Sequence, residues 1–295
     1  MRSAYLETLS DLAFKDKNVL LPLINAEILK IIIEEMSDGF DWSGINPPIF
    51  GAIFERVLSD ERKSGGMHYT TLENIHKVID PLFLDDLKAE LENIFSNSKG
   101  RERIQNLLKF QNKLASLRFL DPACGSGNFL TESFKSLRNL ENKIILDLSG
   151  QTDLKENLEI KVSITQFYGI EVNPFAVAVA RTALWIADNQ MRKAVEEITE
   201  EAPLPLKDYD LIKDDTAMST QERADLGWKD GGWKIPHDDM LYIMGNPPFL
   251  GYSQQSEPQK ADVKSFFGKD KGNGKIEGGG KIDFVACWFA IASEY

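Results

Sequence analysis

Two short stretches far apart in the chain carry residue types that could do chemistry together. The first runs from Phe119 to Phe129 and contains an aspartate followed by two closely spaced glycines. The second, Gly245 to Phe249, joins an asparagine to two prolines and an aromatic residue. Glycines let backbone approach a ligand closely, and an asparagine oxygen accepts hydrogen bonds from an amine. The first stretch therefore predicts a cofactor cradle, and the second predicts a clamp for an amino group.

The glycine stretch indicates a cationic cofactor. It lacks the Gly-Lys-Ser/Thr ending of a nucleotide triphosphatase and the third glycine of a dinucleotide fingerprint. Asp121 begins the loop, and no Lys or Arg lies within it. S-adenosylmethionine, which carries a sulfonium and an amino group, meets these requirements, whereas a plain glycine-rich turn is the alternative. The expected cofactor contacts in this stretch are Asp121, Pro122, Ala123, Cys124, Gly125, Gly127, Asn128 and Phe129.

Two later acidic positions follow expected strands and are further candidates for the cofactor site. Glu171 ends the strand after the glycine loop, where a carboxylate can accept the ribose hydroxyls. Asp215 follows a third strand and is a candidate for the adenine amine of the cofactor. Asp214 is the competing choice at that position, and an ordinary turn aspartate is equally compatible with the pattern.

Upstream of the glycine loop, a threonine pair marks the start of a helix. Thr70 to Glu73 has the spacing of a capping box, so Thr70 is expected to cap a helix that continues through Ile79. Helix N-terminal amides and threonine hydroxyls also bind carboxylates. The sequence therefore predicts that His68, Tyr69 and Thr70 contact the methionine carboxylate of the cofactor, and Thr70 could serve both roles.

The asparagine stretch predicts how an unreactive amine could be methylated. The lone pair of an adenine amine is delocalised into the ring, and acceptors placed at both N–H bonds would localise it toward the methyl donor. Asn246 and the carbonyl of Pro247 are suited to this, while Pro248 fixes the loop and Phe249 offers a face for a flipped base. The chain repeats the tripeptide at Asn46, but that copy follows no strand and is expected to be a helix-entry turn.

Apolar periodicity changes near Leu117. Helical spacing predominates before this point, with helices expected at 49–63, 70–79, 81–95 and 101–117, whereas short strands that alternate with helices follow it, at 118–120, 166–171, 209–212 and 241–244. Alternation of this kind predicts an α/β fold with a mainly parallel sheet, preceded by an N-terminal helical region. Residues 268–281 are glycine-rich and are expected to form a loop near the site, and the apolar run from Phe284 to Ala292 reads as an unfinished helix, which suggests a fragment.

Composition narrows the function classes further. The net charge of −12 argues against a protein whose whole surface binds nucleic acid. A basic DNA-binding groove is therefore expected to be local, or to belong to a domain outside this chain. Two cysteines and three scattered histidines predict neither a disulfide framework nor a metal site. No apolar run reaches the length of a membrane helix and no secretory signal is evident, so a cytoplasmic location without membrane contact is expected.

Taken together, the motif order resembles the gamma-type adenine-N6 DNA methyltransferases, in which the cofactor half precedes the catalytic half. Further matching stretches are similar to MmeI-like type IIG/IIL restriction-modification enzymes, and they begin at Asp41, Ile49, His68, Pro81, Ala183 and Asp283. The resemblance implies a Rossmann-like class I S-adenosylmethionine-dependent fold, with methyl transfer to an adenine flipped out of double-stranded DNA. It also implies a helical connector and cofactor lid over residues 1–116 and a methyltransferase domain over 117–295.

The resemblance leaves parts of such enzymes unaccounted for. No nuclease pattern is evident, and a target-recognition domain or subunit is expected to be missing from this chain. Asp214-Asp215 also departs from the Gly-Asn usual in the narrower family. Methylation of a protein glutamine or of RNA is the alternative enzymatic interpretation, and a non-catalytic fragment that binds cofactor and DNA is the alternative of another class.

Overall fold

The computed structural model contains a four-stranded parallel sheet with the order β3-β2-β1-β4. It describes residues 26–31, 34, 70–150, 158–171, 173–199, 212–214, 241–267 and 282–294. The strands are β1 (Arg118–Asp121), β2 (Phe167–Glu171), β3 (Ile212–Asp214) and β4 (Leu241–Ile243). From β1 the chain adds β2 and then β3 on one side, and it then returns to place β4 on the other side of β1. The expected parallel α/β sheet is thus confirmed, and its order is that of the first part of a Rossmann-like fold.

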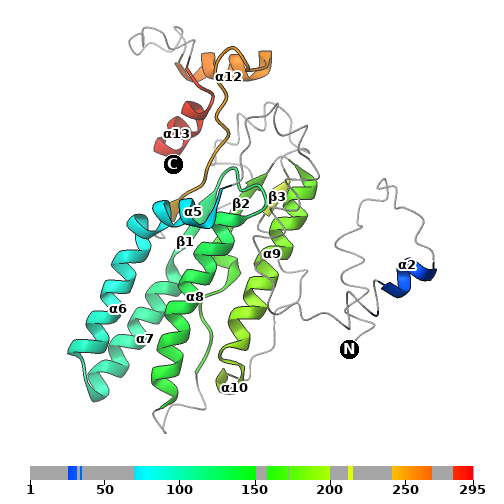
Figure 1. Cartoon of the computed structure of the whole chain (residues 1–295). Helices are drawn as coiled ribbons and strands as arrows, with labels where there is room; N and C mark the ends of the chain where they lie inside the picture. Colours follow the sequence, from blue (N-terminus) through cyan, green and yellow to red (C-terminus); the bar gives the residue numbers. More distant parts are fainter. Residues whose placement is uncertain are drawn as a thin grey trace.

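Four long helices lie side by side, each packed against the next (Figure 1). They are α6 (Asp85–Asn97), α7 (Gly100–Ser116), α8 (Asn128–Ser149) and α9 (Pro174–Lys193). The shorter described elements are α2 (Ala26–Lys30), α5 (Leu72–Ile79), η3 (Asp80–Leu84), η5 (Ile164–Gln166), α10 (Glu196–Thr199), α12 (Glu257–Phe267) and α13 (Val285–Glu294). The described part of the chain holds no helix that is both long and apolar enough to cross a membrane.

A row of aromatic rings joins the sheet to the helices. Phe119 stacks on Phe167 at 4.9 Å and on Tyr242 at 5.4 Å between ring centroids, so neighbouring strands present one apolar face. Phe83 of η3 packs against Phe119 from the helical side at 5.0 Å, and Phe134 of α8 packs against Phe167 at 5.6 Å. Aromatic pairs at these separations stabilise a core beyond the apolar area they bury. Helices and strands on both sides of the expected boundary at 116/117 therefore share one hydrophobic core.

The helix start near Thr70 differs from the expectation by one residue. The cap of α5 is Thr71, whose side chain accepts a hydrogen bond from the Asn74 amide, so the expected capping role of Thr70 is wrong. Threonine is a favoured cap residue at either position, and the cap falls at Thr71 although the capping-box spacing to Glu73 belongs to Thr70. The Thr70 hydroxyl instead contacts a residue that is distant in the sequence.

The helices expected at 70–79 and 81–95 form one uninterrupted run from Leu72 to Asn97. A short π-helix, η3, joins α5 to α6 at Pro81, and the Asp85 amide donates to the Asp80 carbonyl. Proline lacks the amide that would continue the α-helical ladder, and a π-turn absorbs this defect without ending the helix. Of the other expectations, the third strand overlaps the observed β3 only at Ile212, and the helix at 49–63 and the loop at 268–281 lie outside the described residues.

A buried charge network fixes the segment that leads into β2. Glu141 of α8 is fully buried and forms an ion pair with the equally buried Arg138. Its carboxylate also accepts hydrogen bonds from the Gln111 side chain at 2.9 Å and from the amides of Lys161 and Val162. Burial lowers the pKa of Arg138, and the charge of Glu141 opposes that effect. Glu141 thus ties α7, α8 and the entry to β2 together.

Candidate functional site

The two motif loops meet at the point where the strand order reverses. β1 pairs with β2 on one side and with β4 on the other, so the loops that follow β1 and β4 leave neighbouring strands at the same edge. Open α/β sheets bind ligands at such a switch point, outside the carboxyl ends of the strands. The Met244 amide extends the pairing by donating to the Leu120 carbonyl at 2.9 Å. The sheet therefore brings Asp121 and Asn246 to one edge although they are distant in the sequence.

Gly245 packs directly against the buried Asp121 carboxylate. A Cβ atom at Gly245 would lie 2.3 Å from Asp121 Oδ1, and the backbone there has a φ of 153°. Contacts this short require the carboxylate or the loop to move. The close approach of the loop after β4 to the loop after β1 thus requires glycine at position 245.

Replacing Gly245 with alanine is expected to lower the free energy of unfolding by about 3 kcal/mol, because the new methyl group overlaps the Asp121 carboxylate. Urea denaturation measures this change. Gly251→Ala is the matched control, because a Cβ atom at Gly251 meets no heavy atom within 4 Å, and a change within about 0.5 kcal/mol is expected. Equal losses in the two variants would contradict the packing argument.

Asp121 and Glu171 place two buried carboxyl groups at this edge. Asp121 is 1% exposed and Glu171 is 7% exposed. Burial, together with the charge of Glu171, raises the pKa of Asp121 to about 7, although the hydrogen bond from the Ala123 amide lowers it. A buried carboxyl group with a raised pKa, such as that of Asp121, often marks a ligand site. A cationic group beside Asp121 would favour its ionised form.

Glu171 also shapes the glycine loop. Its Oε2 atom accepts from the Gly125 amide at 2.9 Å, and its Oε1 atom accepts from the Asn173 amide at 2.8 Å. The Cys124 amide adds a second tie by donating to the Ile170 carbonyl. Burial and the charges of Asp121 and Glu171 raise the pKa of the Cys124 thiol well above its ordinary value, which disfavours the thiolate.

The Asn246 carboxamide contacts the segment that precedes α5. Its Nδ2 atom donates to the Thr70 hydroxyl at 3.1 Å. Asn246 is exposed and Thr70 is partly buried, so the pair lies at the rim of the switch point. The structure thereby joins the threonine expected in the cofactor lid to the asparagine expected to hold the amine.

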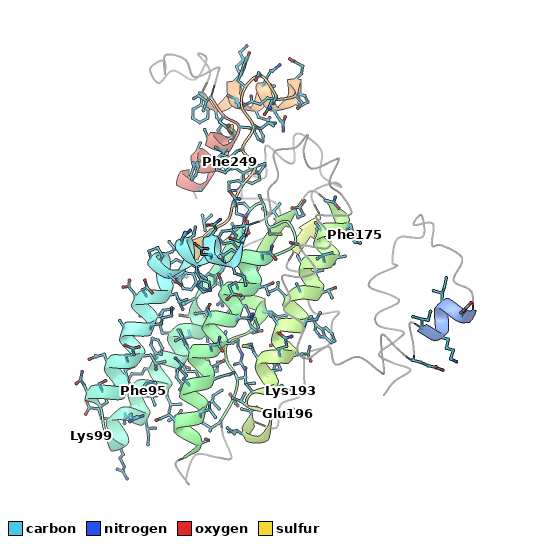
Figure 2. The ribbon with its side chains drawn as sticks, in the orientation of Figure 1. Phe95, Lys99, Phe175, Lys193, Glu196 and Phe249 are labelled. Carbon is cyan, nitrogen blue, oxygen red and sulfur yellow. The ribbon has the colours of Figure 1, made fainter. Side chains whose placement is uncertain are left out.

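The loop that carries Asn246 is anchored at both ends. It leaves β4 on one side, and on the other the Leu250 amide donates to Asp283 Oδ1 at 2.9 Å while the Phe284 amide donates to the Leu250 carbonyl. Phe249 lies between these anchors and is 54% exposed, on the extended segment that leads toward α12 (Figure 2). More than half of this aromatic side chain is therefore open to solvent.

The remaining expected residues occupy different environments. Pro122 is buried, Phe129 is 4% exposed, and both Cys124 and Phe129 belong to the hydrophobic core. Gly127 has a φ of 77° and precedes the first residue of α8, Asn128, as expected for a turn into a helix. His68, Tyr69 and Asp215 lie outside the described residues, and the described strand β3 ends at Asp214.

Sequence reasoning did not single out Gly245 or the contact between Thr70 and Asn246. A glycine directly before the Asn-Pro-Pro stretch was a usable signal for close packing. Sequence reasoning also did not name Phe175, which is 57% exposed at the start of α9, soon after Glu171 (Figure 2). An aromatic residue directly after the Asn173-Pro174 helix start was the available signal there.

Comparison with known proteins agrees with this arrangement. The family model described as the DNA-methyltransferase domain of MmeI matches residues 95–295, which is more than half of the chain. The chain belongs to the MmeI DNA-methyltransferase family. The expected resemblance is thereby confirmed.

Several relatives share this methyltransferase region. DNA methyltransferase A of Bacillus subtilis (strain 168) is 37% identical over 276 residues, covering 92% of this chain and 29% of that protein. A putative type II restriction enzyme and methyltransferase of Methanocaldococcus jannaschii is 28% identical over 197 residues, covering 59% of this chain and 16% of that protein. The solved structure of the type IIL restriction-modification enzyme MmeI in complex with DNA superposes with a TM-score of 0.74 at 33% identity. It covers 99% of this MmeI-family chain, which spans 39% of the MmeI chain.

Proposed function

We propose that this chain is the methyltransferase part of a restriction-modification or related defence enzyme and methylates adenine N6 in double-stranded DNA. The observation that carries the proposal is the convergence at one sheet edge of two buried carboxyl groups and an exposed asparagine. Asp121 and Glu171 lie on one side of the switch point, and Asn246 leaves the adjacent strand. A cation site beside an amine clamp is the arrangement that methyl transfer from a sulfonium requires.

The residues at this edge fit S-adenosylmethionine. Asp121 is suited to hold its amino group and Glu171 its ribose hydroxyls, because both are buried acceptors. The glycine loop from Ala123 to Gly127 contributes backbone rather than basic side chains. His68, Tyr69 and Asp215, outside the described residues, are proposed to complete the cofactor contacts. When bound, the cofactor supplies a methyl group that passes from its sulfur to the amine nitrogen, which releases one proton.

The catalytic loop is proposed to bind the target amine. Asn246 Oδ1 and the Pro247 carbonyl would each accept one N–H bond of the adenine amine, which directs the nitrogen lone pair toward the methyl group. Pro248 restricts the backbone, and Phe249 would stack on the flipped base. In this proposal residues 1–116 provide connector and lid, residues 117–295 provide catalysis, and a further domain or subunit recognises the DNA sequence.

Tritium transfer from labelled S-adenosylmethionine to plasmid DNA, RNA and peptides tests this function. Label is expected in the DNA alone, and digestion to nucleosides is expected to place it in N6-methyladenine. Label in RNA or in a glutamine side chain would replace the proposed substrate. If all three acceptors stayed unlabelled while the chain bound both cofactor and DNA, the protein would be a binding fragment instead of an enzyme.

Cofactor affinity is expected to increase by roughly five- to tenfold from about pH 6 to about pH 7.5. The Asp121 pKa of about 7 means that its carboxyl is mostly protonated at the lower pH, and a cation binds the ionised form. Without ligand the sign for folding is opposite. The Asp121 carboxyl ionises near its ordinary pKa of 3.8 in the unfolded chain but only near 7 in the folded protein, so stability falls as the pH rises from about 4 toward 7. Isothermal titration calorimetry with S-adenosylmethionine measures the affinity.

Asp121→Asn is the matched control for this pH dependence. It is expected to bind more weakly and to lose most of the change in affinity, since the titrating group is gone. The nearby Glu171 and Cys124 remain in the variant. An equal pH dependence in wild type and variant would assign the titration to another group.

A further inference from the structure

We infer that Thr70 is a positioning residue that holds the Asn246 carboxamide with its oxygen toward the target amine. The inference rests on the proposed function. Its basis is the hydrogen bond from Asn246 Nδ2 to Thr70 Oγ1, which joins residues that are 176 positions apart. Thr70 acts on the reaction through Asn246 and, in this role, does not itself touch the reacting atoms.

Donor and acceptor chemistry explains why the orientation matters. A carboxamide has an acceptor oxygen on one side and a donor NH₂ on the other. The adenine amine presents two N–H donors, so it requires the oxygen. A reversed Asn246 would place donors against donors and leave both unsatisfied once the base excludes water. With Nδ2 bound to Thr70 Oγ1, the oxygen remains for the amine.

The supporting threonine sits on a firmly anchored element. Thr70 directly precedes Thr71, the cap of α5, and the Ile75 amide donates to the Thr71 carbonyl at 2.9 Å. Ile75 is fully buried in the core. His76 adds a polar tie, with its Nε2 atom 3.1 Å from Glu132 of α8. Figure 1 shows α5 lying across the end of α8, close to the loops of the sheet edge.

The asparagine side of the contact is equally fixed, because the loop is tied to β1 by the Met244 amide and to the start of α13 at Leu250. Two separately anchored backbones therefore meet through one side-chain hydrogen bond. Fixing the carboxamide before the substrate arrives lowers the ordering cost of the reaction. The Thr70 hydroxyl accepts from Asn246 and keeps its own proton, so it can still donate to a cofactor carboxylate.

Two threonine-to-valine changes one residue apart separate positioning from helix capping. Thr70→Val removes the acceptor for Asn246, whereas Thr71→Val removes the cap of α5 and leaves that contact in place. Thr70→Ser retains a hydroxyl and is the conservative rescue variant. In protein with isotope-labelled asparagine, the side-chain amide signals of Asn246, identified by their loss in Asn246→Asp, report the hydrogen bond directly.

The amide signals of Asn246 are expected to shift and exchange faster in Thr70→Val, and to stay near their wild-type positions in Thr70→Ser and Thr71→Val. At saturating cofactor, kcat for DNA methylation is expected to fall about tenfold or more in Thr70→Val and to return within about threefold of wild type in Thr70→Ser. Cofactor affinity, measured separately, detects any loss of carboxylate binding.

Different results overturn different claims. Unchanged Asn246 signals in Thr70→Val would disprove the hydrogen bond, and shifted signals with a wild-type kcat would disprove its role in positioning. A wild-type chain that transferred no methyl group to DNA would overturn the proposed function, and with it the amine as the partner of the Asn246 oxygen. The amide signals would still report the contact in that case.

Discussion

Asn246→Ala is expected to reduce methyl transfer to DNA by about a thousandfold or more while cofactor affinity stays within about twofold of wild type. The alanine variant loses the acceptor that would localise the lone pair of the amine. Asp121 and Glu171, whose carboxyl groups are proposed to hold the cofactor, lie on β1 and β2 rather than on the loop that carries Asn246, so the substitution leaves them in place. Single-turnover tritium transfer measures the chemical step, and calorimetry measures cofactor binding.

The chain supplies its own control for this prediction. Asn46 occurs in the same Asn-Pro-Pro tripeptide, but Ile49 stands where the later copy has Phe249. Asn46→Ala is expected to methylate DNA at the wild-type rate. A wild-type rate in Asn246→Ala would show that Asn246 does not bind the amine. Equal losses of methylation rate in both variants would indicate a general effect on folding.

Glu141→Gln is expected to lower the free energy of unfolding by about 3–5 kcal/mol. The substitution removes the charge that pairs with Arg138 inside the core, where both side chains are fully buried. It also replaces one acceptor oxygen by an NH₂ donor. The neighbouring groups, which are the Lys161 and Val162 amides and the Gln111 side chain, are donors as well. A loss of this size is a large fraction of the roughly 5–15 kcal/mol that stabilises a typical domain. Urea denaturation followed by circular dichroism provides the measurement.

Glu90→Gln is the matched control for the buried network. Glu90 pairs with Lys113 between α6 and α7, and both side chains are about 40% exposed. Exposed ion pairs contribute little, so a change below about 1 kcal/mol is expected. Similar losses in the two variants would show that burial does not increase the contribution of the Glu141 ion pair to the free energy of unfolding.

The parallel sheet and the two motif loops at its edge could be predicted from the sequence, because both depend on local patterns of residues. Alternating short apolar strands and helical stretches predicted parallel strands, and the glycine and Asn-Pro-Pro stretches were expected at their carboxyl ends. The observed strands β1, β2 and β4 lie where they were expected, to within a residue or so at each end. Of the third expected strand, 209–212, only Ile212 lies among the described residues, and it begins β3.

Contacts across the chain explain what the sequence could not provide. Thr70 has the capping-box spacing to Glu73, yet Thr71 caps α5, and the Thr70 hydroxyl accepts a hydrogen bond from the distant Asn246. The need for glycine at position 245 depends on where the Asp121 carboxylate lies, which no local pattern contains. Likewise, Pro81 signals a break in the local pattern, whereas the helical run continues through η3, where Phe83 packs against Phe119 of the sheet.

The pairing of β1 with β4 has a consequence for the order of folding during synthesis. Phe119 pairs with Phe167 on one side and with the much later Tyr242 on the other. Chains emerge from the ribosome N-terminus first, and pairing between distant segments is slow. β1 and β2 can therefore assemble early, while the other edge of β1 has no partner until residues 241–243 are made. During that interval the nascent chain exposes an open strand edge, and such edges promote aggregation.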